Sequence, residues 1–146
     1  MALAVTACMI VASPCVGKEA GAYLVTGDAI IQPLAGGEDD PARGAALISD
    51  RHRSQCTLGH SGPFPEPHLR GTLAPDLAGV GARLSEGQIR LRVVDMKRLM
   101  PNTIMPSYYR IADAEGRRVA AGWRSKPILT GAEIEDIVAY LVTPKG

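Results

Sequence analysis

The sequence of 146 residues (15.4 kDa) is long enough for one domain of about 100 to 120 residues and a leader, and too short for two ordinary domains. Its 16 basic and 15 acidic residues leave a net charge of +1, so the charge indicates neither nucleic acid nor an anionic membrane as a partner. Only 4% of residues are aromatic, whereas 16 are glycine and 11 are proline, which indicates a small, loop-rich domain. A large bound cofactor would supply the bulk that such a core lacks.

Residues 1–20 are interpreted as an export signal. The stretch from Ala2 to Val16 is apolar, small and uncharged, and it is shorter than the roughly 20 residues that a membrane span needs. Cys8 and Cys15 lie in this leader, and Pro14 before Cys15 disfavours lipid attachment there. We therefore expect a periplasmic protein whose mature chain has no transmembrane span.

The remainder divides into an N-terminal extension (21–39) and one domain (40–146). Asp40 and Pro41 have the chemistry of an N-cap and a first helical residue, which predicts a first helix ending near residues 51–54. Its apolar stripe consists of Ala45, Leu47 and Ile48.

Two more helices follow this first one, separated by loops. Prolines at 63, 65 and 67 predict an extended loop, and residues 73–81 read as a turn-rich strap. A second helix is expected from Ser85 to about Pro101, with its arginines on the side opposite the apolar face. After a surface excursion at 112–119, Thr130 and Glu133 form a capping box for a last helix that ends before Pro144. The pattern predicts an all-α fold.

The run Cys56-Thr57-Leu58-Gly59-His60 is similar to the C-x-x-C-H motif that attaches c-type haem through two thioethers and one imidazole. Gly59 occupies the place of the second cysteine. Cys56 is thus a candidate for a single thioether and His60 for the proximal iron ligand. Met105, in a loop between Ile104 and Pro106, is the candidate for the other axial position, whereas Met96 and Met100 have helical spacing and are predicted to pack in the core.

Other interpretations of these residues remain open at this stage. The run could resemble a haem motif only by chance, and His68 in the proline-rich loop could replace Met105 in the ferric state. A zinc site would need His52, His60, His68 and Cys56 together, without a C-x-x-C pair. A Cys56 nucleophile activated by His60 or His52 lacks a recognisable oxyanion element.

Several longer stretches resemble the SoxX family, the monohaem cytochrome subunits of the SoxAX complexes of bacterial thiosulfate oxidation. They cover about the whole of residues 40–145 and consist of DPARGAALI, the cysteine and histidine of CTLGH, GTLAPDLAGVGARLSEGQIRLRVVD, PNTIMPSYYR and KPILTGAEIEDIVAYLVT. The segments GVGARLSEGQIRLRVVD and TIMPSYY are much more specific than the haem half-motif.

The resemblance implies a class I cytochrome c fold, with about three to five helices and long loops around one haem c. It implies that the first and last helices cross closely at Gly44 and Tyr140, and that His60 and Met105 are the axial ligands. It also implies a periplasmic heterodimer with a SoxA cytochrome subunit, a sulfur-carrier protein complex as a further partner, and a downstream electron acceptor. In that family thiosulfate is coupled oxidatively to a cysteine of the carrier (L-cysteine S-thiosulfotransferase activity), and this subunit would transfer electrons without catalysing the chemistry.

Gly59 is the departure from the family pattern. One thioether from Cys56 is chemically sufficient when axial ligation and burial also hold the haem, so a single-thioether cytochrome is the leading hypothesis. The alternative is a haem-poor structural subunit that stabilises the SoxA partner. An inactivating or engineered substitution or a sequencing error would each also explain Gly59.

Overall fold

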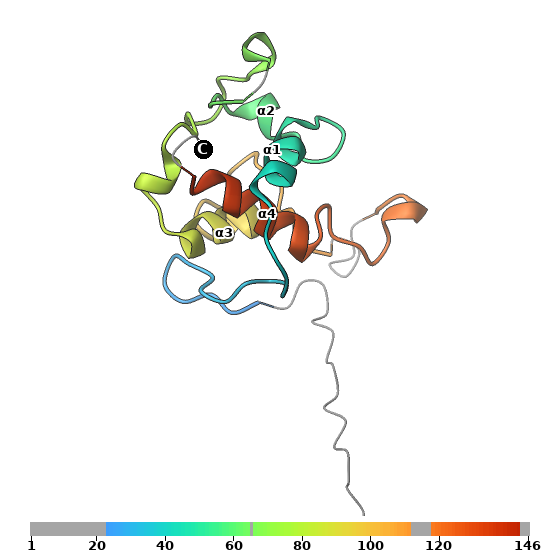
Figure 1. Cartoon of the computed structure of the whole chain (residues 1–146). Helices are drawn as coiled ribbons and strands as arrows, with labels where there is room; N and C mark the ends of the chain where they lie inside the picture. The colour runs from blue at the N-terminus through green and yellow to red at the C-terminus, as the bar shows by residue number, and fades with distance from the viewer. Residues whose placement is uncertain (1–22, 65, 112–117, 144–146) are drawn as a thin grey trace, which may run out of the picture.

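The computed structural model describes residues 23–64, 66–111 and 118–143, and within these residues the regular structure is helical, with one isolated bridge between Thr26 and Ala29. Figure 1 shows the order of the elements along the chain. The helices are α1 (Pro41–Ser49), α2 (Cys56–Gly59), α3 (Glu86–Asp95) and α4 (Gly131–Leu141). Single turns of 3-10 helix lie at Pro67–Leu69, Val80–Ala82, Met96–Arg98 and Ala121–Trp123. The predicted all-α fold is confirmed.

Helix α1 begins where the sequence predicts. The Asp40 carboxylate accepts the backbone N–H groups of Ala42 (2.8 Å) and Arg43 (3.3 Å), and Pro41 occupies the first turn. The predicted end near residues 51–54 is wrong, because the backbone of Asp50 is extended and residues 51–54 form turns. This early end lets the chain change direction before Cys56.

Helix α4 packs across α1 at Gly44 (Figure 1). A Cβ atom at Gly44 would lie 2.0 Å from the carbonyl oxygen of Asp136 and 3.0 Å from Cβ of Tyr140, so only glycine allows this approach. The close crossing expected at Gly44 and Tyr140 is present. The capping box of α4 also forms as predicted, since Glu133 N–H donates to Thr130 Oγ1 (3.3 Å) and Thr130 N–H to Glu133 Oε2 (2.8 Å).

Helix α3 carries a buried arginine that the sequence interpretation placed on the outer side. The Arg90 side chain is 4% exposed and forms a bidentate ion pair with Glu135 of α4, with Nε to Oε1 at 2.9 Å and Nη2 to Oε2 at 2.8 Å. Its Nη1 donates to the carbonyl of Ile30 (2.8 Å). The prediction that the arginines of this helix all face away from the core is therefore wrong for Arg90.

Residues 23–39 contain no helix, yet they contribute to the core. Ile30 and Leu34 are almost fully buried, and the N–H of Ile30 donates to Gly87 O (2.9 Å). The N–H of Leu34 donates to the Glu135 carboxylate (2.7 Å). The buried Arg90–Glu135 pair thus joins α3, α4 and this N-terminal segment.

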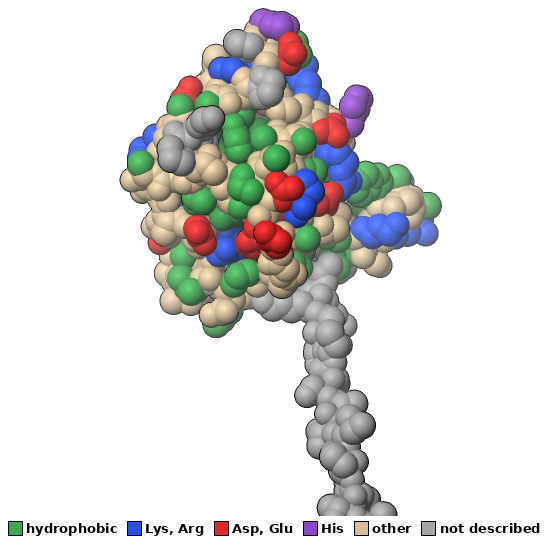
Figure 2. Space-filling view, viewed as in Figure 1, with side chains coloured by type: hydrophobic (Ala, Val, Ile, Leu, Met, Phe, Trp, Pro, Cys, Tyr) green, Lys and Arg blue, Asp and Glu red, His purple; other side chains and the backbone are tan. Residues whose placement is uncertain are grey.

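The surface shown in Figure 2 carries acidic and basic side chains interspersed, in agreement with the near-neutral net charge. In the part of the chain that the structure describes, no helix is both long and apolar enough to cross a membrane. The predicted export signal with Cys8 and Cys15, most of the excursion at 112–119, and Pro144 lie outside the described residues.

Candidate haem site

The short helix α2 is placed by the turn that follows α1. Ser54 is completely buried, and its hydroxyl donates to the carbonyl of Leu47 at the end of α1 (2.7 Å). Gln55 then adopts a left-handed conformation (φ 58°), after which α2 begins at Cys56. The geometry of this turn fixes the Cys56 thiol relative to the core.

Residues 71–77, which include the first part of the strap, run beside residues 57–61 and are joined to them by three backbone hydrogen bonds. Gly71 N–H donates to Thr57 O (2.8 Å), Ala74 N–H to Gly59 O (2.9 Å), and Leu77 N–H to Ser61 O (2.9 Å). This pairing is close, since a Cβ atom at Gly71 would lie 2.0 Å from Leu58 O. These residues therefore lie against the middle of the CTLGH run, from Thr57 to Gly59.

This strap determines the orientation of the His60 ring. His60 Nδ1 lies 2.7 Å from the carbonyl oxygen of Pro75. Because a carbonyl oxygen can only accept, Nδ1 must carry the proton, and Nε2 is then the unprotonated nitrogen of the neutral ring. A backbone carbonyl bonded to the far nitrogen is the usual arrangement for a histidine that ligates a metal through the other nitrogen.

The Cys56 thiol lies beside Tyr108 in an apolar environment. Burial raises the pKa of the Cys56 thiol above its usual value, although hydrogen bonding with Ser54 and Tyr108 opposes the shift. Burial also raises the pKa of the Tyr108 phenol, whose hydroxyl donates to the carbonyl of Ser54. Cys56 is therefore a protonated thiol at neutral pH, held close to the turn that precedes it.

Met105 lies in a loop whose first residues are held by hydrogen bonds. Its N–H donates to Thr103 Oγ1 (3.2 Å), and the Lys97 ammonium donates to the carbonyl of Thr103 (2.9 Å). The N–H of Thr103 donates in turn to Met100 O (3.0 Å). The loop returns to the core at Tyr108, which is 3% exposed, while Met105 itself is half-buried.

These segments enclose one cavity of about 580 Å³, which Cys56, Gly59, His60 and Met105 all line. The remaining walls are mostly apolar and are provided by α2, the strap and the Met105 loop. The volume is in the range of about 300–1,000 Å³ that bound cofactors and other small molecules occupy. An apolar cavity with one thiol, one imidazole oriented by a carbonyl, and one thioether fits a haem.

The structure thus brings all four predicted site residues to one cavity, while two neighbouring methionines differ from expectation. Met96 and Met100 were predicted to pack in the core, but both line this cavity, and Met100 is 53% exposed. The reason is that α3 ends at Asp95. Met96 therefore does not continue the helix but begins a 3-10 turn beside the cavity.

His68 does not line the cavity. It lies on the surface in the proline-rich segment, where Nε2 is 3.4 Å from a carboxylate oxygen of Glu66. Sequence reasoning missed Pro75, the partner of His60, although the strap that contains it was recognised. No local signal in the sequence identifies which carbonyl of a strap faces an imidazole.

The two other chemistries considered for Cys56 and His60 gain no support from the structure. Among the described residues, no group of three or more histidine, cysteine or acidic side chains is placed to hold a metal ion such as zinc. The raised pKa of the Cys56 thiol disfavours a nucleophile, which needs a thiolate near neutral pH.

The helical architecture and the cavity define a protein with an all-α, class I cytochrome c-like fold. Scans against protein-family models and against curated proteins find no match. Among solved structures, the chain is similar to a chain of the crystal structure of SoxXA from P. pantotrophus, with a TM-score of 0.74 and 29% sequence identity. The match covers 85% of this chain and 95% of that chain. It supports a SoxX-like cytochrome.

Proposed function

We propose that this protein is a periplasmic, SoxX-like electron-transfer subunit that carries one haem c. The observation that carries the proposal is the hydrogen bond from His60 Nδ1–H to Pro75 O, in a cavity that Cys56 and Met105 also line. Cys56 would provide the single thioether, and His60 and Met105 the axial ligands. The similarity to SoxXA supports this assignment.

The bound haem would supply a one-electron redox centre. The residues of this chain would hold it and set its environment: the Pro75 carbonyl keeps the proton on Nδ1 and strengthens His60 as a donor. A thioether ligand from Met105 favours the reduced state and therefore a higher potential. The mostly apolar walls would surround the haem with a less polar environment than water.

In the proposed reaction the partner subunit, a SoxA-like cytochrome, holds the site of sulfur chemistry. Joining the terminal sulfur of thiosulfate to a carrier-protein cysteine thiol forms one S–S bond and releases one proton and two electrons. This subunit would take these electrons one at a time and pass them to a downstream acceptor. It would perform no bond-forming step itself.

The rim of the cavity offers a surface for the partner. Leu73 and Ile104 are 76% and 80% exposed, and Leu58 and Met100 are also exposed beside them. Apolar side chains gathered at one opening are typical of protein interaction sites. The proposal places the SoxA-like partner on this rim, where its haem would come near the cavity.

The test is covalent haem attachment. When the chain is matured together with a c-type attachment system, we expect a haem-stained band that survives denaturing electrophoresis and disappears in Cys56→Ala. The pyridine spectrum of the reduced haem should show one saturated vinyl group. Protein that folds normally and pairs with its partner but carries no haem would refute the redox role.

That last outcome would support the second candidate, a haem-poor structural subunit. Gly59 is the specific observation in its favour, because attachment systems usually require both cysteines. The discriminating measurement is the ratio of haem to protein in the isolated heterodimer. A ratio near one supports electron transfer, and a ratio near zero supports the structural role.

A further inference from the structure

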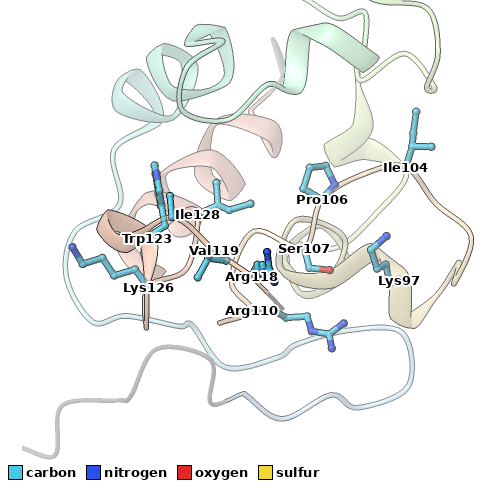
Figure 3. Close-up of a pocket in the computed structure, with 11 residues that line it drawn as sticks. Lys97, Ile104, Pro106, Ser107, Arg110, Arg118, Val119, Trp123, Lys126 and Ile128 are labelled. Atoms are coloured by element: carbon cyan, nitrogen blue, oxygen red, sulfur yellow. The ribbon is translucent and has the colours of Figure 1, made fainter. Parts of the chain in front are cut away.

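A second cavity of about 490 Å³ is lined in part by Ile104 and Pro106, the two neighbours of Met105 (Figure 3). Ile104 and Pro106 line both cavities, so the loop that bears Met105 is the wall between them. The function proposed above makes no use of this second cavity, which we call the basic pocket.

Four cationic side chains line the basic pocket: Lys97, Arg110, Arg118 and Lys126. No acidic residue is among the described residues that line it. Figure 3 shows that these side chains come from separate segments. Arg118 lies in the middle, Lys126 lies on one side of it, and Lys97 and Arg110 lie on the opposite side. The segment near residue 120 projects to the right in Figure 1, and in the same view in Figure 2 it carries basic side chains at its surface.

Most of this positive charge is not neutralised within the described part of the chain. The buried carboxylate of Asp95 accepts the Ser107 hydroxyl (2.6 Å) and lies 3.6 Å from Arg110. Lys97 and Lys126 donate to the backbone carbonyls of Thr103 and Gly122, and neither forms an ion pair with an acid of the described ranges. Arg118 forms no ion pair with a described residue, and its side chain is exposed.

The remaining wall contains apolar groups and a single indole. Trp123, Val119 and Ile128 line the pocket beside the cations, and Trp123 is 46% exposed. Cations that line a partly apolar hollow attract a ligand with concentrated negative charge, since each contact would be a charge-assisted hydrogen bond. A monovalent halide would leave most of these donors unused.

We propose that the basic pocket binds a small dianion, either a tetrahedral oxyanion or a short dicarboxylate. The ligand would lie near Arg118, between the segments that carry Lys97 and Lys126, with Trp123 in the wall of the pocket. An anion held there would add negative charge next to the wall that carries Met105. This site is separate from the proposed haem cavity and does not depend on haem attachment.

The test uses the fluorescence of Trp123, which is the only tryptophan of the sequence, together with calorimetry on the full chain. Sulfate and succinate are titrated at constant ionic strength against chloride. We expect a saturable response to at least one dianion and none to chloride. A tetrahedral oxyanion site favours sulfate, and a dicarboxylate site favours succinate.

Two variants separate a defined site from general attraction. Arg118→Gln should weaken dianion binding about tenfold, the effect of one lost charge-assisted contact. Arg124→Gln removes the same charge next to Trp123 but from a residue that does not line the pocket, and it should leave the affinity within about twofold. Both residues are exposed, so both variants should fold.

Equal weakening in the two variants, or equal responses to dianions and chloride, would overturn the proposal. Binding of a glutamate-rich peptide without binding of sulfate or succinate would overturn it as well and would assign the pocket to an acidic protein partner. Because these readouts need no haem, a failure of the haem assignment would leave this test unaffected.

Discussion

Gly44 of α1 and Asp136 of α4 lie in direct backbone contact, and a Cβ atom at Gly44 would lie 2.0 Å from the Asp136 carbonyl oxygen. Gly44→Ala must therefore push the two helices apart. We expect a loss of about 3 kcal/mol in the free energy of unfolding, the upper part of the range for overpacking. Urea denaturation followed by circular dichroism measures it.

Gly36→Ala is the matched control, because a Cβ atom at Gly36 meets nothing within 4 Å. Its free energy of unfolding should change by less than about 0.5 kcal/mol. Equal stability of the two variants would show that the helices do not cross as closely as described.

The buried ion pair between Arg90 and Glu135 gives a second prediction. Arg90→Met alone leaves the Glu135 carboxylate buried without its partner, so it should cost about 3–5 kcal/mol. The double variant Arg90→Met/Glu135→Leu should recover part of this loss. Recovery cannot be complete, because the Leu34 N–H and the Ile30 carbonyl lose the side chains that they bond. A double variant less stable than Arg90→Met would contradict this account.

The same pair shows where sequence reasoning ends. The helix starts at Asp40 and Thr130 were predictable, because each cap acts within three residues of itself. Arg90 was misplaced because its partner lies 45 residues away, and helical periodicity carries no information about such a partner. An arginine on an amphipathic helix is normally solvated.

The candidate site follows the same division. Cys56, His60 and Met105 could be selected from residue type and from the resemblance to the SoxX family, and the structure places them at one cavity. The Pro75 carbonyl and the side chains of Met96 and Met100 could not, since their positions depend on how the strap and the loop after α3 fold back. The four cations of the basic pocket are far apart in the sequence, so no local sequence motif predicts that pocket.

Stability should depend on pH through Asp136. The Arg43 guanidinium donates to the Asp136 carboxylate (2.8 Å), and together with the N–H of Asp40 it lowers the pKa of that carboxyl. A carboxyl whose pKa is lower in the folded state stabilises the protein at pH values above its ordinary pKa of about 3.9. This stabilisation is lost as the pH falls through the folded-state pKa.

Asp136→Asn should therefore be less stable than the parent at pH 7, by about 1 kcal/mol. The loss is no larger because solvent screens the charge of the exposed Arg43. The difference should shrink as the pH falls below 4. Urea midpoints measured from pH 7 to pH 2 test this, and a difference that stays constant over that range would argue against the ion pair.

The role proposed for Met105 can be separated from mere proximity to haem. In haem-loaded protein, Met105→Ala should remove the weak long-wavelength absorption of ferric methionine ligation and lower the reduction potential, since a thioether ligand favours the reduced iron. Met100→Ala is the control, because Met100 lines the same cavity. It should keep the absorption band. Loss of the band in Met100→Ala alone would assign the axial position to Met100.

Gly59→Cys tests the departure at the haem motif. A Cβ atom at Gly59 would lie 3.7 Å from Cβ of Ala74, an ordinary contact, so the free energy of unfolding should change by less than about 0.5 kcal/mol. The pyridine spectrum should change from one saturated vinyl group to two, because the new thiol lies on the wall of the same cavity.

Gly71→Cys provides the contrast for Gly59→Cys, since its Cβ atom would lie 2.0 Å from Leu58 O in the paired strap. It should destabilise the protein by about 3 kcal/mol and add no thioether. If Gly59→Cys folds but retains one unsaturated vinyl group, the geometry around α2 does not suit a second thioether. The single-thioether site would then be a property of the fold, and restoring the cysteine would not by itself restore the usual attachment.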